Sequence, residues 1–372
     1  MQKKWTCIGL MSGTSGDGVD ASIISTNGIN HYETIKDKYF EYDIDIYKDI
    51  HNLKDKINNI YHLKKFKKEI NDIERKITIF HAKIIKELQI SNETIVGFHG
   101  QTIYHNAKEK ISKQLGDGKL LNQLTNKNIV YNFRKNDILN GGQGAPLTPI
   151  FHQLISAQNN IKLPVCFLNI GGISNITIVN STNNFLDLSS KDIGPGNCLI
   201  DTWVRNNSDK KFDVDGKLAL SGARNEIIFE QAQELYMNRN NKKKLSLDTK
   251  DFDISFVRGL SLEDGVTTLT DFSASIIGEE LSLSIEEAQT NIENVLICGG
   301  GRNNKVLIEK IQKNLPSYIN LKNIDDFRIN GDFIESQAFA FLAIRSILKL
   351  PITFPNTTGC KKACTGGDLV KN

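Results

Sequence analysis

The stretch Cys7–Ile24, which reads CIGLMSGTSGDGVDASII, decides how the rest of this 372-residue chain is interpreted. Two apolar runs flank a polar segment that contains Gly13, Gly16 and Gly18. We therefore expect a strand, a tight glycine turn and a second strand. Glycine adopts positive φ and lets backbone amides approach a ligand closely. Clustered amides bind anionic oxygens, although an ordinary polar hairpin turn has a similar composition.

Two acidic side chains, Asp17 and Asp20, lie in the same segment. Their negative charges would repel a bare phosphate. A phosphate bound here would therefore need a divalent cation such as Mg²⁺, which pairs carboxylates with phosphate oxygens.

A second stretch repeats this plan. Val165–Val179 reads VCFLNIGGISNITIV, with an apolar run on each side of Gly171 and Gly172. Two such hairpins, each opening one half of the chain, predict an α/β fold with a duplicated core in two lobes around a central cleft. We expect an N-terminal lobe at residues 1–130 and a C-terminal lobe at 131–372, whose tail can return to the first lobe.

The composition excludes several classes of protein. There are 46 Lys and Arg against 43 Asp and Glu, a net charge of +3, so nucleic acid is not an expected partner. The lysine runs Lys64–Lys68 and Lys242–Lys244 have the composition of solvated faces. No apolar segment reaches the length of a membrane span, and the N-terminus lacks the features of a signal peptide. Six scattered cysteines are typical of free thiols, so we expect a cytoplasmic protein.

Helical periodicity predicts helices within residues 43–90 and over 150–157, 264–281 and 335–348. Strands are expected at Thr94–Phe98 and Val295–Cys298. The first of these leads into His99–Thr102, which we interpret as a polar strand end. Strand ends are the usual ligand-binding positions in open α/β sheets.

Asp192 is the strongest catalytic candidate. It lies in an expected loop, Lys191–Asn197, just before the rigid sequence Gly194-Pro-Gly196. A carboxylate held there could act as a general base on a hydroxyl or on water. It could equally accept hydrogen bonds from turn amides as a purely structural residue.

The glycines Gly299–Gly301 follow a strand and precede a helix, which allows a nucleotide to approach the backbone. A plain strand–helix turn would look the same. The run does not match the Rossmann fingerprint, and no Walker A loop is present. The opening loop also lacks the nucleophile elbow of a serine hydrolase.

Together these motifs resemble the anhydro-N-acetylmuramic acid kinases, and they follow the family order over almost the whole chain. The matching segments are Gly9–Asp20, His99–Thr102, Phe133–Leu147, Leu168–Thr177, Asp192–Asn197, Ser246–Phe252, Ile297–Asn304 and Glu335–Ala343.

The resemblance implies the two-lobed, ribonuclease H-like fold of the sugar kinase, Hsp70 and actin superfamily. It implies an ATP- and Mg²⁺-dependent enzyme that acts on 1,6-anhydro-N-acetylmuramic acid. Phosphorylation of O6 and opening of the anhydro ring by water would give N-acetylmuramic acid 6-phosphate and ADP, in the recycling of peptidoglycan sugars. A homodimer is also expected.

Carried over by position, Asp192 matches the base that activates water. The ATP-binding residues implied are Gly13, Thr14, Ser15, Gly16, Asp17, Gly18, Val19, Asp20, Gly171, Gly172, Gly299, Gly300 and Gly301. Asp17 and Asp20 would organise Mg²⁺, directly or through water. His99, Gln101, Arg134 and Glu335 are the weaker candidates for the sugar site.

Two residues depart from the family pattern: Gly16 replaces a larger apolar residue, and Asn132 replaces an aspartate. Gly16 could loosen the nucleotide loop, and Asn132 could lose a charged contact. Two alternatives therefore remain open. One is a sugar or acyl kinase of the same superfamily with another substrate. The other is a nucleotide-dependent sugar sensor without turnover.

Overall fold

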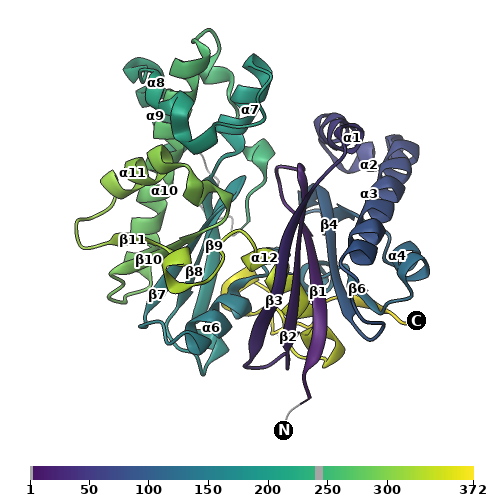
Figure 1. The fold of residues 1–372 in the computed structure, drawn as a ribbon. Coiled ribbons are helices and arrows are strands. Elements are labelled where there is room, and N and C mark those ends of the chain that lie inside the picture. The colour runs from purple at the N-terminus through teal and green to yellow at the C-terminus, as the bar shows by residue number, and fades with distance from the viewer. Residues whose placement is uncertain (1–2, 239–245) are drawn as a thin grey trace. The chain divides into compact units, whose positions relative to one another are not determined.

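The computed structural model describes residues 3–238 and 246–372, which form two compact units. Unit 1 comprises residues 1–160, 182–186 and 332–372, and unit 2 comprises 161–181 and 187–331 (Figure 1). The boundary expected near residue 130 lies inside unit 1. Residues 332–372 belong to unit 1 as well. The lysine run Lys242–Lys244 falls outside the described residues.

Unit 1 contains a mixed seven-stranded sheet with the order β12-β6-β4-β1-β2-β3, to which β5 adds by pairing with β4. β1, β2 and β3 are antiparallel neighbours, whereas β4 is parallel to β1 and β6 is parallel to β4. The strands are β1 (Trp5–Ser12), β2 (Gly18–Thr26), β3 (Tyr32–Glu41), β4 (Ile95–Asn106), β5 (Ile111–Leu115), β6 (Ile129–Tyr131) and β12 (Asp368–Val370). The expected hairpin is β1–β2.

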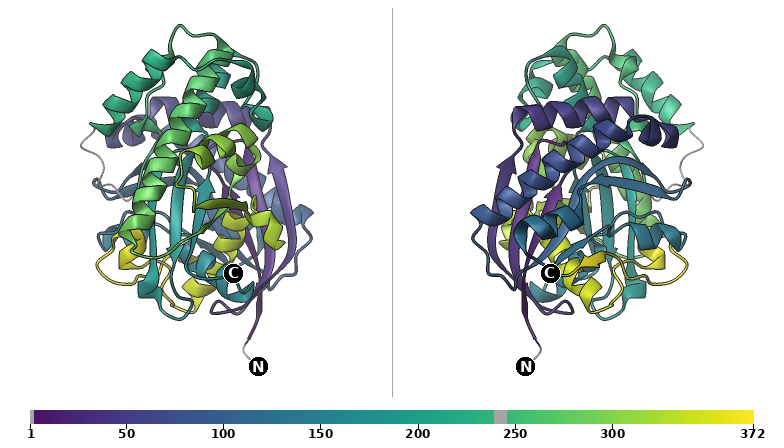
Figure 2. Two further views of the ribbon diagram at one scale, coloured as in Figure 1. Left: turned by 90° about the vertical axis from the view of Figure 1, so that its left-hand side faces the viewer. Right: turned by 90° about the vertical axis from the view of Figure 1, so that its right-hand side faces the viewer.

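The helices of unit 1 are α1 (Ile44–Lys56), α2 (Ile60–Lys65), α3 (Lys67–Glu87), α4 (Gly118–Thr125), α5 (Lys135–Leu139), α6 (Pro149–Gln158), α12 (Ile334–Ile347) and α13 (Pro355–Thr358). α1 and α3 lie beside one another and pack on β4 (Figure 2). Ile8 and Leu10 of β1 join their apolar residues in one core cluster. The predicted helices within 43–90 are confirmed.

Two glycines bring α12 against the other face of this sheet. Side chains alternate along a strand, so Gly9 faces α12 where Ile8 and Leu10 face the opposite core. A Cβ on Gly9 would lie 1.8 Å from the carbonyl oxygen of Ser336, and one on Gly97 would lie 2.2 Å from that of Phe339. The helix is therefore in backbone contact with β1 and β4.

Unit 2 contains a five-stranded sheet with the order β11-β10-β7-β8-β9. Its strands are β7 (Val165–Ile170), β8 (Ile173–Val179), β9 (Leu188–Pro195), β10 (Asn294–Cys298) and β11 (Asn320–Asn323). Its helices are α7 (Cys198–Asn207), α8 (Lys217–Ser221), α9 (Glu226–Met237), α10 (Leu262–Glu287) and α11 (Lys305–Lys313). α10 packs along β9 and α11 (Figure 2), and Ser261 caps its first turn by accepting from the amide of Asp264.

The two sheets repeat one connectivity. In each sheet, three successive antiparallel strands are followed by a fourth strand parallel to the first and a fifth strand parallel to the fourth. The strands β1, β2, β3, β4 and β6 thus correspond to β7, β8, β9, β10 and β11. The prediction of an α/β fold with a duplicated ribonuclease H-like core is therefore confirmed.

None of the helices in the described part of the chain combines the length and the apolar character that crossing a membrane requires. All six cysteines are buried and carry free thiols.

Candidate functional site

The turn between β1 and β2 has the conformation that its glycines predict. The amide of Gly16 donates to the carbonyl of Gly13 over 3.1 Å, and Gly16 has a φ of +64°. Thr14 and Ser15 are exposed at the tip. Gly18 packs against β3, where a Cβ would lie 2.5 Å from the carbonyl oxygen of Phe40. Val19 is buried in the core, so only its backbone could face a ligand.

Gln101 holds this turn in place. Its Nε2 donates to the carbonyls of Gly13, over 3.0 Å, and Thr102, over 3.2 Å. Its Oε1 accepts from Ser12 Oγ over 2.6 Å. Both amide donors are thus used within the protein, and the side chain is fully buried. This arrangement favours a role in shaping the loop over contact with a sugar. Ser12 was missed from the sequence because its partner lies 89 residues away.

The acids of the turn lie in an electronegative environment. Burial, which has the largest effect, and four neighbouring carboxylates together raise the pKa of the Asp20 carboxyl to about 8; in order of decreasing effect the carboxylates are Glu335, Asp17, Asp332 and Asp37. Asp17 accepts a hydrogen bond from Ser15 Oγ over 2.5 Å. A carboxyl in such surroundings favours a nearby cation, because a positive charge would relieve the repulsion.

These acids fit Mg²⁺ bound together with a nucleotide. Within the described residues, no three His, Cys, Asp or Glu side chains are grouped so that they could hold a metal ion by themselves. Mg²⁺ rarely uses such a cage, and usually takes one or two carboxylates, several waters and phosphate oxygens. Asp17 and Asp20 can supply the carboxylates.

Three of the four expected sugar-site residues lie together in unit 1. Arg134 donates to His99 Nε2 and also, through Nη1, to the carbonyl of Gly144 over 2.8 Å. Glu335, in the first turn of α12, is half-buried, and loss of solvent raises its pKa, while the charge of the nearby Arg134 opposes that shift. His99 lies within β4, which continues to Asn106, so the expectation that the strand ends at His99–Thr102 is wrong. Pairing with β5 extends it.

The departure at Asn132 has a local explanation. Asn132 has a φ of +57°, a left-handed conformation that asparagine tolerates better than most residues. Its Nδ2 donates to Asp368 Oδ2 over 2.9 Å. An aspartate at this position would oppose the Asp368 carboxylate instead, so the amide suits the contact with β12.

In unit 2, Asp192 lies within β9 and pairs with Asn175 of β8. The expectation of a loop over Lys191–Asn197 is therefore wrong for its first residues, because β9 continues to Pro195. Asp192 Oδ2 accepts a hydrogen bond from the amide of Leu247 over 2.7 Å. This partner lies 55 residues away, so the contact is not a local turn. A partly buried carboxylate on a rigid strand can serve as a base.

The other candidate glycines, Gly171, Gly172 and Gly299–Gly301, differ in whether packing leaves room for a side chain. The carbonyls of Gly171 and Gly172 accept from the amides of Asn197 and Gly196, each over 2.9 Å, just before α7. Gly171 itself has room, since a Cβ there would come no closer than 3.5 Å to another atom.

At the end of β10, Gly299 and Gly301 are required by packing: a Cβ would lie 2.4 Å from Asn169 Oδ1 or 2.3 Å from Ile170 Cγ2. Gly300 faces open space. Arg302, which the sequence did not reveal, steadies this turn by bonding the carbonyl of Gly299 and the carboxylate of Asp325. Gly300 is thus the position best suited to close approach by a ligand.

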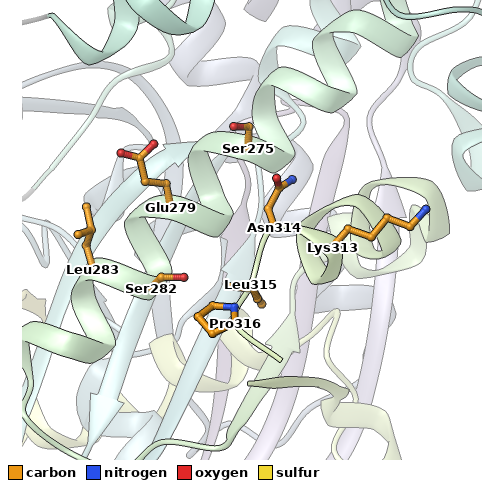
Figure 3. Close-up of a pocket in the computed structure, with 8 residues that line it drawn as sticks. All are labelled: Ser275, Glu279, Ser282, Leu283, Lys313, Asn314, Leu315 and Pro316. Atoms are coloured by element: carbon orange, nitrogen blue, oxygen red, sulfur yellow. The ribbon is translucent and has the colours of Figure 1, made fainter. Parts of the chain in front are cut away.

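A surface pocket of unit 2 lies elsewhere (Figure 3). It is lined by Ser275, Glu279, Ser282, Leu283, Lys313, Asn314, Leu315 and Pro316, from α10 and the end of α11. None of the candidate residues lines it.

Comparison with known proteins agrees with the motifs. A family model described as anhydro-N-acetylmuramic acid kinase matches residues 5–372. The chain is 58% identical to an anhydro-N-acetylmuramic acid kinase of Pelagibacter ubique, with 100% of both chains covered. It is 35% identical to one of Agrobacterium fabrum, with 98% of both covered.

Among solved structures, component A of the (R)-2-hydroxyglutaryl-CoA dehydratase of Acidaminococcus fermentans aligns with a TM-score of 0.42 at 10% identity, over 93% of this chain and 100% of that one. That likeness is too low to support any conclusion. The full-length sequence matches, in contrast, confirm the resemblance. The chain belongs to the anhydro-N-acetylmuramic acid kinase family.

Proposed function

We propose that this protein uses ATP to phosphorylate the 6-oxygen of 1,6-anhydro-N-acetylmuramic acid while water adds at C1. The products are N-acetylmuramic acid 6-phosphate and ADP, a step in recycling peptidoglycan sugars. The observation that carries the proposal is the 58% identity over the full length to a kinase of that name. The geometry within each unit supports it.

Asp192 is the proposed base. As the bond between C1 and O6 breaks, the Asp192 carboxylate removes a proton from the attacking water, and the oxygen of that water stays on C1. The hydrogen bond from the Leu247 amide to Oδ2 helps to orient the carboxylate. General base catalysis of this kind contributes roughly 10²–10⁴-fold to a rate.

The released O6 accepts the terminal phosphoryl group of ATP, and ADP leaves. Phosphoryl transfer depends mainly on positioning and charge neutralisation. The turn Gly13–Gly18 would offer backbone amides to the phosphates, and Gly299–Gly301 would face the adenosine. Bound Mg²⁺, held through Asp17 and Asp20, would neutralise phosphate charge.

In unit 1, His99, Arg134 and Glu335 would bind and orient the sugar. The Arg134 guanidinium suits an anionic oxygen such as the lactyl carboxylate of the muramic acid. Glu335 offers acceptors for hydroxyl groups. Gln101 would hold the nucleotide-binding turn in its conformation through its hydrogen bond to the carbonyl of Gly13.

We also propose a cytoplasmic homodimer. Six free, buried thiols are typical of a reducing compartment. Light scattering of the purified protein should give twice the monomer mass, and a monomer at micromolar concentration would contradict the dimer.

The decisive test is a product assay in ¹⁸O-labelled water. The purified full chain, ATP, Mg²⁺ and the anhydro sugar should yield N-acetylmuramic acid 6-phosphate that carries one ¹⁸O at C1. A folded protein that makes no such product would refute the proposal. ADP formed with other sugars or acyl acids would then indicate a related kinase, and sugar binding without ADP would indicate a sensor.

A further inference from the structure

Helix α1 touches the turn between β1 and β2 through one side chain. Lys54 Nζ donates to the carbonyl oxygen of Thr14 over 2.6 Å. The helix has little freedom to move away, because Ile50 and Leu53 on the same helix are fully buried in the core of unit 1. Lys54 is therefore held at the tip of the turn by the fold.

The absence of a side chain at Gly16 makes this contact possible. A Cβ on Gly16 would lie 3.1 Å from Ile50 Cγ2 and 3.6 Å from Lys54 Nζ. A larger residue would occupy the space that α1 now fills, and it would be strained at a φ of +64°. The departure at Gly16 and the position of Lys54 thus belong to one arrangement.

We propose that Lys54 is a positioning residue of the nucleotide site, and that it adds a positive charge next to the phosphate-binding turn. The charge-assisted bond to Thr14 holds the tip of the turn in one conformation. The ammonium group of Lys54 also places a positive charge beside the turn, which attracts the negative charge of a polyphosphate. The inference rests on the proposed function only in taking Gly13–Asp20 as the ATP phosphate loop.

The test is the affinity of the full chain for a non-hydrolysable ATP analogue with Mg²⁺, measured by calorimetry without sugar. Lys54→Met should weaken binding about tenfold, equivalent to ~1.4 kcal/mol, and should reduce the dependence of affinity on salt. Lys54→Arg should stay within about threefold of the wild type. Lys48→Met is the matched control, because Lys48 is an exposed lysine of the same helix.

Two more variants separate the parts of the proposal. Lys54→Gln keeps a hydrogen-bond donor without the charge. It should therefore bind the analogue more tightly than Lys54→Met does, but its affinity should depend on salt as weakly as that of Lys54→Met. Gly16→Ala should weaken binding in the wild type and add less in Lys54→Met, since both changes act on one contact. The KM for the sugar should stay unchanged in the Lys54 variants.

Equal affinities of Lys54→Met, Lys48→Met and the wild type would overturn the inference, as would a wild type that binds no nucleotide. A Lys54→Met variant with a lowered melting temperature but normal affinity would also overturn it, by indicating a structural role alone. A wild type that binds the analogue but forms no product refutes the proposed function and leaves this inference standing.

Discussion

Arg134 donates two hydrogen bonds to one nitrogen of His99, from Nε over 3.2 Å and from Nη2 over 2.8 Å to Nε2. The other nitrogen, Nδ1, lies 2.8 Å from the carbonyl oxygen of Gly100. Arginine can only donate and a carbonyl can only accept, so His99 must be neutral, with its proton on Nδ1. Burial, and then the charge of Arg134, hold the pKa of His99 well below 6.5.

We therefore expect His99 to stay neutral throughout the working pH range. Because its folded pKa lies below the unfolded value, the stability linked to His99 is present above pH 6.5 and is lost as the pH falls. NMR of the imidazole should show no titration between pH 8 and pH 6. In Arg134→Met, which lacks the guanidinium charge, the pKa should rise. A wild-type His99 that titrates near 6.5 would contradict this tautomer.

Gln101 offers a test of role. Gln101→Glu replaces an amide donor by a carboxylate that would face the carbonyls of Gly13 and Thr102. The turn should loosen, so we expect the KM for ATP to rise about tenfold, with a much smaller change in the KM for the sugar. Steady-state kinetics with each substrate varied in turn measures both. A larger rise in the KM for the sugar than in the KM for ATP would indicate that Gln101 binds the sugar.

The Asp20 carboxyl should lower the stability of the ligand-free protein. Its pKa is raised from 3.8 to about 8, so the stability linked to this group is greatest below pH 4 and is lost as the pH rises through 8. At pH 8, Asp20→Asn should therefore have a free energy of unfolding about 1–3 kcal/mol higher than that of the wild type, as measured with a denaturant. Near pH 4 the two proteins should be equally stable.

The same variant tests the metal assignment. Mg²⁺ with an ATP analogue should raise the melting temperature of the wild type more than that of Asp20→Asn, because only the carboxylate attracts the ion. Equal shifts in the two proteins would show that Asp20 takes no part in cation binding.

Local signals sufficed to predict the hairpins and the duplication. Apolar runs on both sides of Gly13 and Gly171 lie within single strands and turns, so no distant partner was needed to recognise them. The contacts that shape the site were different. Ser12 bonds Gln101, and Lys54 bonds Thr14, across stretches of chain whose pairing depends on how the sheet and α1 pack.

Asp192 shows how a local signal misled. The Gly-Pro-Gly sequence after it favours a loop, yet hydrogen bonding to β8 keeps β9 extended as far as Pro195. At Asn132 the local signal agrees with the structure, because asparagine tolerates positive φ better than most residues do. Its hydrogen bond to Asp368, 236 residues later, could not be predicted from local sequence.

The close packing of α12 on the sheet predicts an asymmetry among the glycines. Gly9→Ala would place a Cβ 1.8 Å from the Ser336 carbonyl, a backbone atom that cannot move aside. We expect a loss of about 3 kcal/mol or more, measured by urea unfolding. Gly300→Ala is the control, because its Cβ would meet no atom within 4 Å, and its stability should be unchanged. A stable Gly9→Ala would mean that α12 can shift.

Asp192→Asn should separate catalysis from folding. The asparagine side chain keeps an oxygen that can accept from the Leu247 amide, so strand β9 and the affinity for ATP should be preserved. It cannot take a proton from water, so kcat should fall roughly 10²–10⁴-fold. Calorimetry with an ATP analogue and the ¹⁸O product assay measure the two effects on the same preparation. Near-normal kcat would make Asp192 a structural acceptor whose only task is to hold Leu247.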